Sequence, residues 1–246
     1  MNMARLFAAT LCVCGAICGS AYSADDLFTA VKSGDLAAVT AALSSGVDVN
    51  AADLSGPPLH IAVARGDVKI AEALIAAGAD LDAKGDPAGA HPLHTASLSN
   101  QPSVAALLID KGADVEARDG EGRTPLMIAA VYGSEETAAV LLSKGADTSA
   151  KDEIYQDSPI HFAAWSNQAA VVRLLISKGA DPNLVSDHDG ETPLHYAAMT
   201  NAHNVIEVLF ASKADAGLRN KAGKTPLEVA KSPATADLLR KLGAMK

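Results

Sequence analysis

The chain has 246 residues, of which 49% are hydrophobic and only 4% aromatic, and its 20 basic and 29 acidic side chains give a net charge of −9. This acidic balance disfavours nucleic acid as a partner, because a phosphate backbone selects basic surfaces. The chain's three cysteines are all near its start, so the rest of it can form neither a disulfide framework nor a thiolate site: Cys12, Cys14 and Cys18.

Residues 1–23 have the pattern of a secretory signal peptide. Arg5 precedes an apolar run over residues 6–18, and Ala21 and Ser23 are the small residues expected before a cleavage point. The run is too short for an ordinary membrane span. We therefore expect cleavage after Ser23, no integral membrane segment in the mature chain, and a periplasmic or secreted protein. An uncleaved anchor is the alternative. A short exported chain of this kind favours a bacterial, periplasmic protein over a eukaryotic secreted one.

From residue 24 onward the sequence repeats itself. A proline stands inside related stretches such as GETPLHYAA and GRTPLMIAA, and its spacings are 34, 33, 34, 34 and 33 residues: Pro58, Pro92, Pro125, Pro159, Pro193 and Pro226. A second motif, GAD in most copies, recurs with the same period: Gly46, Gly78, Gly112, Gly145 and Gly179. Two motifs that keep the same phase indicate a structural repeat.

A T-P-L-H-x-A signature with a period of about 33 residues resembles the ankyrin repeat. The resemblance implies an all-α ankyrin-repeat solenoid, in which helix–turn–helix units stack and β-turn or hairpin tips join them. We expect one domain over residues 24–246, with an N-terminal cap at 24–52 and a C-terminal cap at 220–246. Five full repeats lie between the caps: 53–84, 85–118, 119–151, 152–185 and 186–219.

Each repeat carries start and stop signals for two short helices. Thr or Ser before the proline is a good N-cap, and proline suits the first helical position; His91 and Pro57 depart from this pattern. The first helix should end at a residue that tolerates the left-handed conformation: Gly66, Asn100, Gly133, Asn167 or Asn201. The second helix has Val and Leu at helical spacing, so it presents one apolar face that only a neighbouring repeat can bury.

The charge is unevenly distributed along the repeats. Residues 24–212 contain 11 basic and 26 acidic side chains, whereas residues 213–246 contain 8 basic and 3 acidic ones. An acidic array favours a partner with a basic surface, which it attracts at long range. The alternative is that the charge serves only solubility.

The histidines are the main candidates for chemistry. Four occupy one slot, two residues after the proline, where the resemblance implies a structural hydrogen bond: His60, His94, His161 and His195. His91 and His94 could touch one metal, but no third ligand is evident. The stretch that starts at Asp187 resembles a calcium loop but has Ala198 where such a loop needs a glutamate. We expect no catalytic residue, no metal and no cofactor, and a protein that is not an enzyme.

In ankyrin-repeat proteins the partner usually meets the concave face, which inner helices and tips form. The resemblance places on this face the positions six and seven residues after each proline, and we expect partner contacts from Arg65, Leu98, Val131, Tyr132, Trp165 and Met199. Tip residues should extend the contact: Glu121, Arg123, Ile154, Tyr155, Asp157, His188, Asp189 and Glu191. Aromatic residues and Met are enriched in protein interfaces. The alternative is that Trp165 and Met199 only pack between neighbouring helices.

These patterns predict a monomeric, non-enzymatic protein–protein interaction module of an exported compartment. One alternative is a ligand-binding protein with an unrecognised site, which would contain clustered, perturbed titratable groups in a closed pocket. Another is an inhibitor or protector of an exported enzyme.

Overall fold

The computed structural model describes residues 22–53 and 56–243. The predicted signal peptide therefore lies outside the described residues, apart from its last two positions. The described part of the chain contains α-helices joined by turns, with one isolated bridge between Asp53 and Gly56 and no β-strand. None of these helices is long and apolar enough to cross a membrane. The expected all-α solenoid is confirmed.

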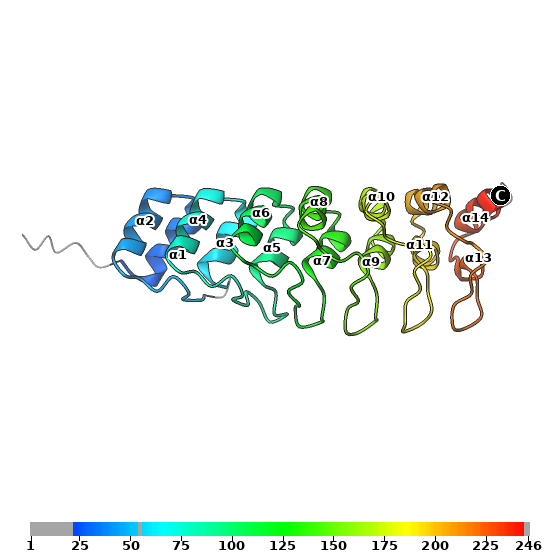
Figure 1. Cartoon of the computed structure of the whole chain (residues 1–246), viewed down its shortest axis with the longest axis horizontal. Coiled ribbons are helices and arrows are strands. Elements are labelled where there is room, and N and C mark those ends of the chain that lie inside the picture. Colours follow the sequence, from blue (N-terminus) through cyan, green and yellow to red (C-terminus); the bar gives the residue numbers. More distant parts are fainter. Residues whose placement is uncertain (1–21, 54–55, 244–246) are drawn as a thin grey trace, which may run out of the picture.

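The helices form two parallel layers that follow the chain from one end of the molecule to the other (Figure 1). The inner layer consists of α1 (Ala24–Ser33), α3 (Pro58–Arg65), α5 (Pro92–Leu98), α7 (Pro125–Tyr132), α9 (Pro159–Trp165), α11 (Pro193–Thr200) and α13 (Pro226–Val229). The outer layer consists of α2 (Leu36–Ser44), α4 (Val68–Ala76), α6 (Pro102–Asp110), α8 (Glu135–Ser143), α10 (Ala169–Ser177), α12 (His203–Ala211) and α14 (Pro233–Gly243). Each of the seven expected segments holds one inner and one outer helix.

The core is continuous along the array because every repeat is covered by its neighbours. One apolar residue follows the proline of each full repeat and is at most 1% exposed: Leu59, Leu93, Leu126, Ile160 and Leu194. The outer helices contribute a matching row of fully buried leucines: Leu74, Leu108, Leu141, Leu175 and Leu209. Burying a leucine side chain stabilises a fold by roughly 2 kcal/mol. The resulting stability is shared between adjacent repeats.

The inner helices of the full repeats end where the sequence predicts. The residue expected to be left-handed has a positive φ in all five copies: Gly66 (74°), Asn100 (48°), Gly133 (72°), Asn167 (58°) and Asn201 (58°). Of the predicted N-caps, Thr124 accepts a hydrogen bond from the Met127 N–H at 3.4 Å. Ser158 and Thr192 differ, since their hydroxyls lie 2.9 and 2.8 Å from a histidine Nδ1 instead. The histidine slot therefore takes over part of the capping role.

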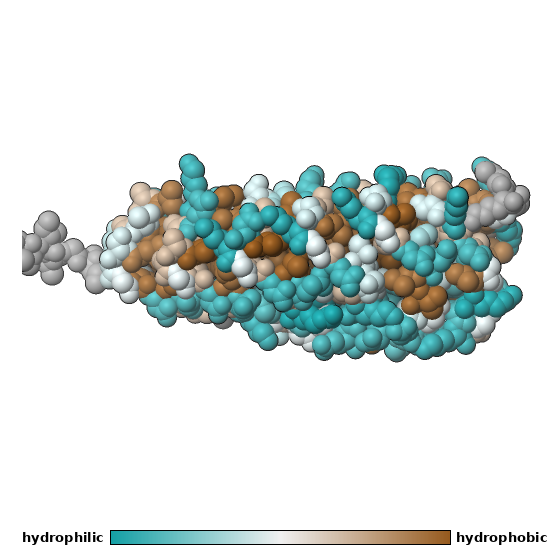
Figure 2. Space-filling view, viewed as in Figure 1, coloured by the Kyte–Doolittle hydropathy of each residue, from teal (hydrophilic) through white to brown (hydrophobic). Residues whose placement is uncertain are grey.

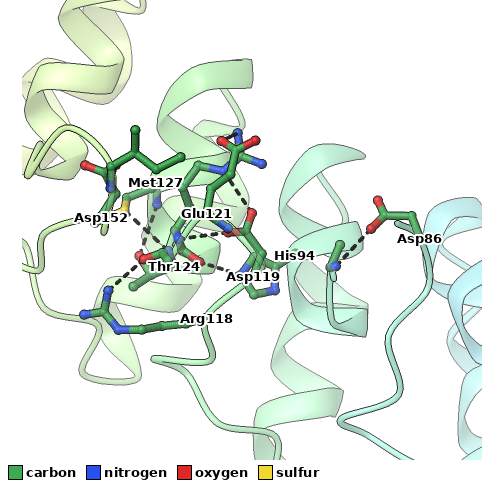
Figure 3. A network of polar contacts seen from close by, with 12 residues as sticks. Asp86, His94, Arg118, Asp119, Glu121, Thr124, Met127 and Asp152 are labelled. Carbon is green, nitrogen blue, oxygen red and sulfur yellow. Dashed lines mark hydrogen bonds and ion pairs between the residues drawn. The ribbon is translucent and has the colours of Figure 1, made fainter. Parts of the chain in front are cut away.

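The tips project from the inner layer and are held by polar side chains at their bases. In one tip, Oδ1 of Asp119 accepts the backbone N–H groups of Glu121 and Arg123, each at 2.9 Å (Figure 3). Its Oδ2 pairs with the Arg123 guanidinium at 2.9 Å. Arg118 donates to the carbonyl oxygens of Gly122 and Lys151, both at 2.7 Å, and thereby links two successive tips. These contacts fix where the tip side chains point.

We expect substitution of one buried leucine to cost far more than substitution of an exposed one. Leu175 is fully buried in α10, and Leu175→Ala leaves a cavity that should lower the free energy of unfolding by about 3 kcal/mol. Leu98 is 47% exposed, so Leu98→Ala is the matched control and should cost less than about 0.5 kcal/mol. Urea unfolding of both variants measures the difference. Equal losses in the free energy of unfolding would contradict the assignment of Leu175 to the core and of Leu98 to the surface.

Candidate functional site

The inner-helix face exposes large apolar side chains at the predicted positions. Leu98, Tyr132 and Trp165 are 47%, 58% and 50% exposed, and Val131 and Met199 are half-buried. Figure 2 shows hydrophilic residues along most of the edge where the tips lie, and apolar residues over parts of the helices. A half-exposed Trp165 is not simply packed between helices, whereas Met199 packs against the core as well as reaching this face.

The structure divides the predicted contact residues among separate hollows. A hollow of about 430 Å³ lies between α9 and α11, and we call it the α9–α11 pocket; its lining residues are Tyr155, Asp157, His161, Phe162, Trp165, Asp189, Glu191, Tyr196 and Met199. A second hollow, of about 270 Å³, includes Leu98, Arg123, Val131 and Tyr132. Arg65 lies at a third, near the N-terminal end. His188 lines none of these three, but its ring lies 6.1 Å from that of Tyr155.

Aromatic rings form one wall of the α9–α11 pocket. The ring centroids of Trp165 and Tyr196 lie 5.7 Å apart at an interplanar angle of 83°. Tyr196 also meets the buried His161 ring at 5.7 Å and 74°. Such edge-to-face contacts stabilise aromatic pairs and hold their orientation. The wall is therefore rigid on the Tyr196 side, while half of Trp165 stays open to solvent.

Carboxylates form the other side of the pocket. The Tyr196 hydroxyl donates to Asp157 Oδ2 at 2.7 Å and also lies 3.3 Å from Asp189 Oδ2. Glu191 accepts a hydrogen bond from the Asn220 amide at 2.8 Å through Oε1. Two buried oxygens have no hydrogen-bond partner in the described structure: Asp157 Oδ1 and Glu191 Oε2. The pocket therefore contains acceptor atoms that the protein itself does not satisfy.

Asp157 differs from the expectation of an exposed tip residue. Only 6% of it is exposed, because the tip folds its side chain in against Tyr196. Burial raises the pKa of the Asp157 carboxyl to about 6, and the negative charges of Asp189 and Asp152 act in the same direction. The hydrogen bond from the Tyr196 hydroxyl opposes this rise without cancelling it. Burial and the neighbouring Asp157 also raise the pKa of the Tyr196 hydroxyl.

The repeated histidines connect each inner helix to the tip that follows it along the chain. In each copy Nε2 contacts a carbonyl oxygen of the following tip region at 2.8–2.9 Å: Ala83, Arg123, Leu184 and Lys224. Nδ1 of His161 accepts the Ser158 N–H at 3.1 Å, and His195 does the same with Thr192. A neutral ring with its proton on Nε2 satisfies both contacts. Burial lowers the pKa of His60, His94 and His161, the last to about 4.

His91 and His94, the pair that could have touched one metal, do not have the geometry of a metal site. The rings of His91 and His94 lie 5.5 Å apart, but His94 Nδ1 accepts the His91 backbone N–H at 3.2 Å and its Nε2 contacts Arg123. Both nitrogens of His94 are therefore occupied. No cluster of three or more metal-ligating side chains occurs among residues 22–53 and 56–243.

Three residues of the α9–α11 pocket are absent from the predicted contact set: His161, Phe162 and Tyr196. A signal for two of them exists, since Phe162 and Tyr196 both stand three residues after the proline, where the preceding copies have Ile61, Thr95 and Ile128. Asp157 and Glu191 likewise share the position two residues before the proline. Comparison of every repeat position, and not only the two expected to face a partner, identifies Phe162 and Tyr196.

Comparisons with known proteins agree with this architecture. The family model for ankyrin repeats in three copies matches residues 27–119, 117–186 and 160–244. The ankyrin repeat domain of Bcl-3, described as a unique member of the IkappaB protein family, has a similar structure: TM-score 0.74 and 32% identity, over 87% of this chain and 97% of that one. The human ASB11 ankyrin repeat domain gives a TM-score of 0.78 and 26% identity, over 88% and 96%. No curated protein sequence matches this one.

Acidification should destabilise the array through its buried histidines. The pKa of His161 is about 4 in the folded protein against an ordinary 6.5, so between these values the unfolded chain binds the extra proton. The stability that the neutral His161 ring gives the folded state is fully present above pH 6.5 and is lost as the pH falls towards 4. Urea unfolding at stepped pH should show a loss of about 1.4 kcal/mol per pH unit for such a histidine.

The Asp157 carboxyl should make the folded state more stable, not less stable, as the pH falls. The variant Asp157→Asn tests this expectation. The pKa of the carboxyl rises from 3.8 to about 6 on folding, so the folded state binds the extra proton in that window and the charge costs stability as the pH rises through it. The variant should be more stable than the wild type at pH 7 and should lose stability more steeply on acidification. An unchanged pH profile would show that the carboxyl is not perturbed.

Proposed function

Because the chain belongs to the ankyrin-repeat family, we propose that it is a binding module that docks a partner protein on the face formed by its inner helices and tips. Ankyrin repeats are generally non-enzymatic protein–protein interaction modules, which makes this the default role of such a domain. The observation that carries the choice of face is its row of exposed apolar side chains. Leu98, Tyr132 and Trp165 are each about half exposed on successive inner helices.

The physical argument for this face is its combination of anchors and charge. Large apolar side chains that remain exposed on a folded surface usually mark an interaction site. Tyr and Trp are also the residue types that most often dominate binding energy. The acidic excess over residues 24–212 adds long-range attraction for a basic partner surface. We expect the chain to act as a monomer, with one partner along its inner face.

We also propose that the module works after export from the cytoplasm, in a bacterial periplasm or outside the cell. Support comes from the charged start, apolar run and small residues of the first 23 positions. The expected cut also coincides with a structural boundary, because Ser23 is the N-cap of α1 and Ala24 its first residue. Cleavage would remove the Ser23 cap but leave Asp25 and Asp26 in the first turn, where acidic side chains favour a helix.

A second candidate function, the binding of a small ligand, rests on the α9–α11 pocket alone. Its volume of about 430 Å³ and its mixed lining are within the range of ligand sites. Asp157 in this pocket has the kind of perturbed pKa that functional sites show. Capture of a small molecule by the purified chain, with no protein partner found, would favour this alternative. An inhibitory or protective role toward an exported enzyme is a special case of protein binding.

Removal of an exposed anchor should weaken partner binding without unfolding the array. Trp165→Ala and Tyr132→Ala should each weaken capture of the partner from the compartment of export by roughly thirtyfold, the usual effect at a binding hot spot. Leu36→Ala is the matched control, since Leu36 is 37% exposed on the outer helix α2. Quantitative affinity capture and thermal unfolding give the two readouts. Loss of fold in the inner-face variants would instead favour a packing role.

Processing of the full chain gives a separate test of export. We expect intact-mass spectrometry of protein recovered from a bacterial periplasm to show a chain that begins at Ala24. Substitution of Ser23 by a large residue should reduce cleavage there, because the processing site requires a small residue at this position. An intact N-terminus on cytoplasmic protein would contradict the export proposal.

A further inference from the structure

We propose that the α9–α11 pocket receives an arginine side chain of the partner protein, with the guanidinium against Asp157 and Glu191 and the apolar stem along Trp165. This inference rests on the proposed function and names the group that the binding face would recognise. Four properties of the pocket support it: its charge, its unsatisfied acceptors, its aromatic wall and its size.

The lining of the pocket is acidic. It includes Asp157, Asp189 and Glu191, and none of its lining residues is a lysine or an arginine. Asp157 and Glu191 are equivalent positions of successive repeats, and the same position in the preceding repeat is occupied by Arg123. Arg123 cannot supply the missing charge, because it pairs with its own Asp119 at 2.9 Å and with Glu121 at 3.0 Å. The ion-pair contact of Glu191 in the described structure is with His195 Nδ1, at 3.7 Å, and Asp157 has no ion pair there. A cation from outside would therefore complement the charge of the pocket.

The buried carboxylates also have acceptor capacity to spare. Asp157 and Glu191 are only 6% and 7% exposed, and one oxygen of each has no hydrogen-bond partner in the described structure. A buried acceptor without a donor costs free energy, and an incoming donor removes that cost. The Tyr196 hydroxyl provides one proton near both Asp157 and Asp189, and Asp189 Oδ1 accepts the Glu191 N–H at 2.9 Å. Asp157 Oδ1 is therefore the oxygen of this pair that has no donor in the described structure.

The aromatic wall suits a cation that carries an apolar stem. Trp165 is half exposed beside these carboxylates, and an indole face is the best aromatic surface for a cation. Met199 and Phe162 provide apolar contacts for methylene groups. The volume of about 430 Å³ lies near the lower end of ligand pockets, so it accommodates one side chain better than a large molecule.

Arginine fits these features better than lysine does. Its planar fork presents five N–H donors, so it can reach acceptors on two separate carboxylates, and it stacks on aromatic faces. It is also less strongly hydrated than an ammonium group, which lowers the cost of entering a partly buried site. Lysine offers a compact point charge that is harder to desolvate and cannot stack in the same way.

The test uses the only tryptophan of the chain as its reporter. The mature protein is titrated with acetyl-Gly-Arg-Gly-amide, and the Trp165 indole N–H resonance and fluorescence are followed. A saturable change with a dissociation constant on the order of a millimolar is expected for a single anchored side chain. The matching lysine peptide should bind more weakly, and the peptide with citrulline, the uncharged analogue of arginine, should produce no saturable change.

Variants locate the binding to the two carboxylates. Asp157→Asn and Glu191→Gln each keep an oxygen that can accept the existing hydrogen bond, and each should weaken arginine-peptide binding by roughly thirtyfold, as expected for removal of one partner from a buried charge pair. Glu207→Gln makes the same change of charge on the outer helix α12, where Glu207 is exposed, and should have no effect. Thermal unfolding verifies that each variant remains folded.

The outcomes separate this inference from the proposed function. Equal binding of the citrulline and arginine peptides, or no binding of either, overturns the arginine site even if the protein still captures a partner through Trp165. Equal binding of the lysine and arginine peptides overturns the preference for a guanidinium. Failure of the wild-type protein to capture any partner overturns the proposed function, whatever the peptides do.

Discussion

Burial between adjacent repeats is the constraint on which the rest of the structure depends. Each inner helix packs on the next inner helix and on its own outer helix, and one cluster of buried apolar residues runs through the repeats of the described chain. The histidine slot adds a polar link at the same junction, since His161 joins the tip region at Leu184 while its Nδ1 accepts from Ser158. Equivalent positions of successive repeats therefore lie side by side. A surface site can therefore arise where two consecutive repeats differ from the other copies at the same position of the repeat.

The α9–α11 pocket is an example of such a change. Asp157 and Glu191 share one register position, and Phe162 and Tyr196 share another, so each kind of side chain occurs twice along the array. The repeat spacing brings the Tyr196 hydroxyl, 39 residues along the chain, within 2.7 Å of Asp157. The pocket combines features that stabilise the junction with features that cost stability. The apolar and aromatic contacts stabilise the junction, whereas two buried oxygens remain without donors.

The sequence alone was sufficient to predict the repeats, but not the pocket. Periodic prolines and the glycine or asparagine at each helix end predict the architecture because they encode local backbone geometry, as Gly66 and Asn167 illustrate. The pocket depends on contacts between side chains of different repeats, which a consensus motif does not contain. The burial of Asp157 also follows from the path of its tip and from the ring of Tyr196. A tip residue expected at the surface therefore became part of a partly closed site.

The position of the pocket near the C-terminal cap ties its shape to the order of that cap. Asn220 donates to Glu191 at 2.8 Å, and the Lys221 N–H donates to the Asp189 carbonyl at 2.9 Å, so residues that precede α13 position two of the pocket carboxylates. The inner helix α13 has only four residues, and terminal repeats lack a neighbour on one side. Local opening of this end would release Glu191 and widen the pocket. Conversely, any ligand that binds Glu191 in its observed position must stabilise the cap, because binding to the closed form shifts the opening equilibrium towards it. If the pocket binds a partner as proposed, the order of the C-terminal cap and the affinity of the pocket are therefore coupled.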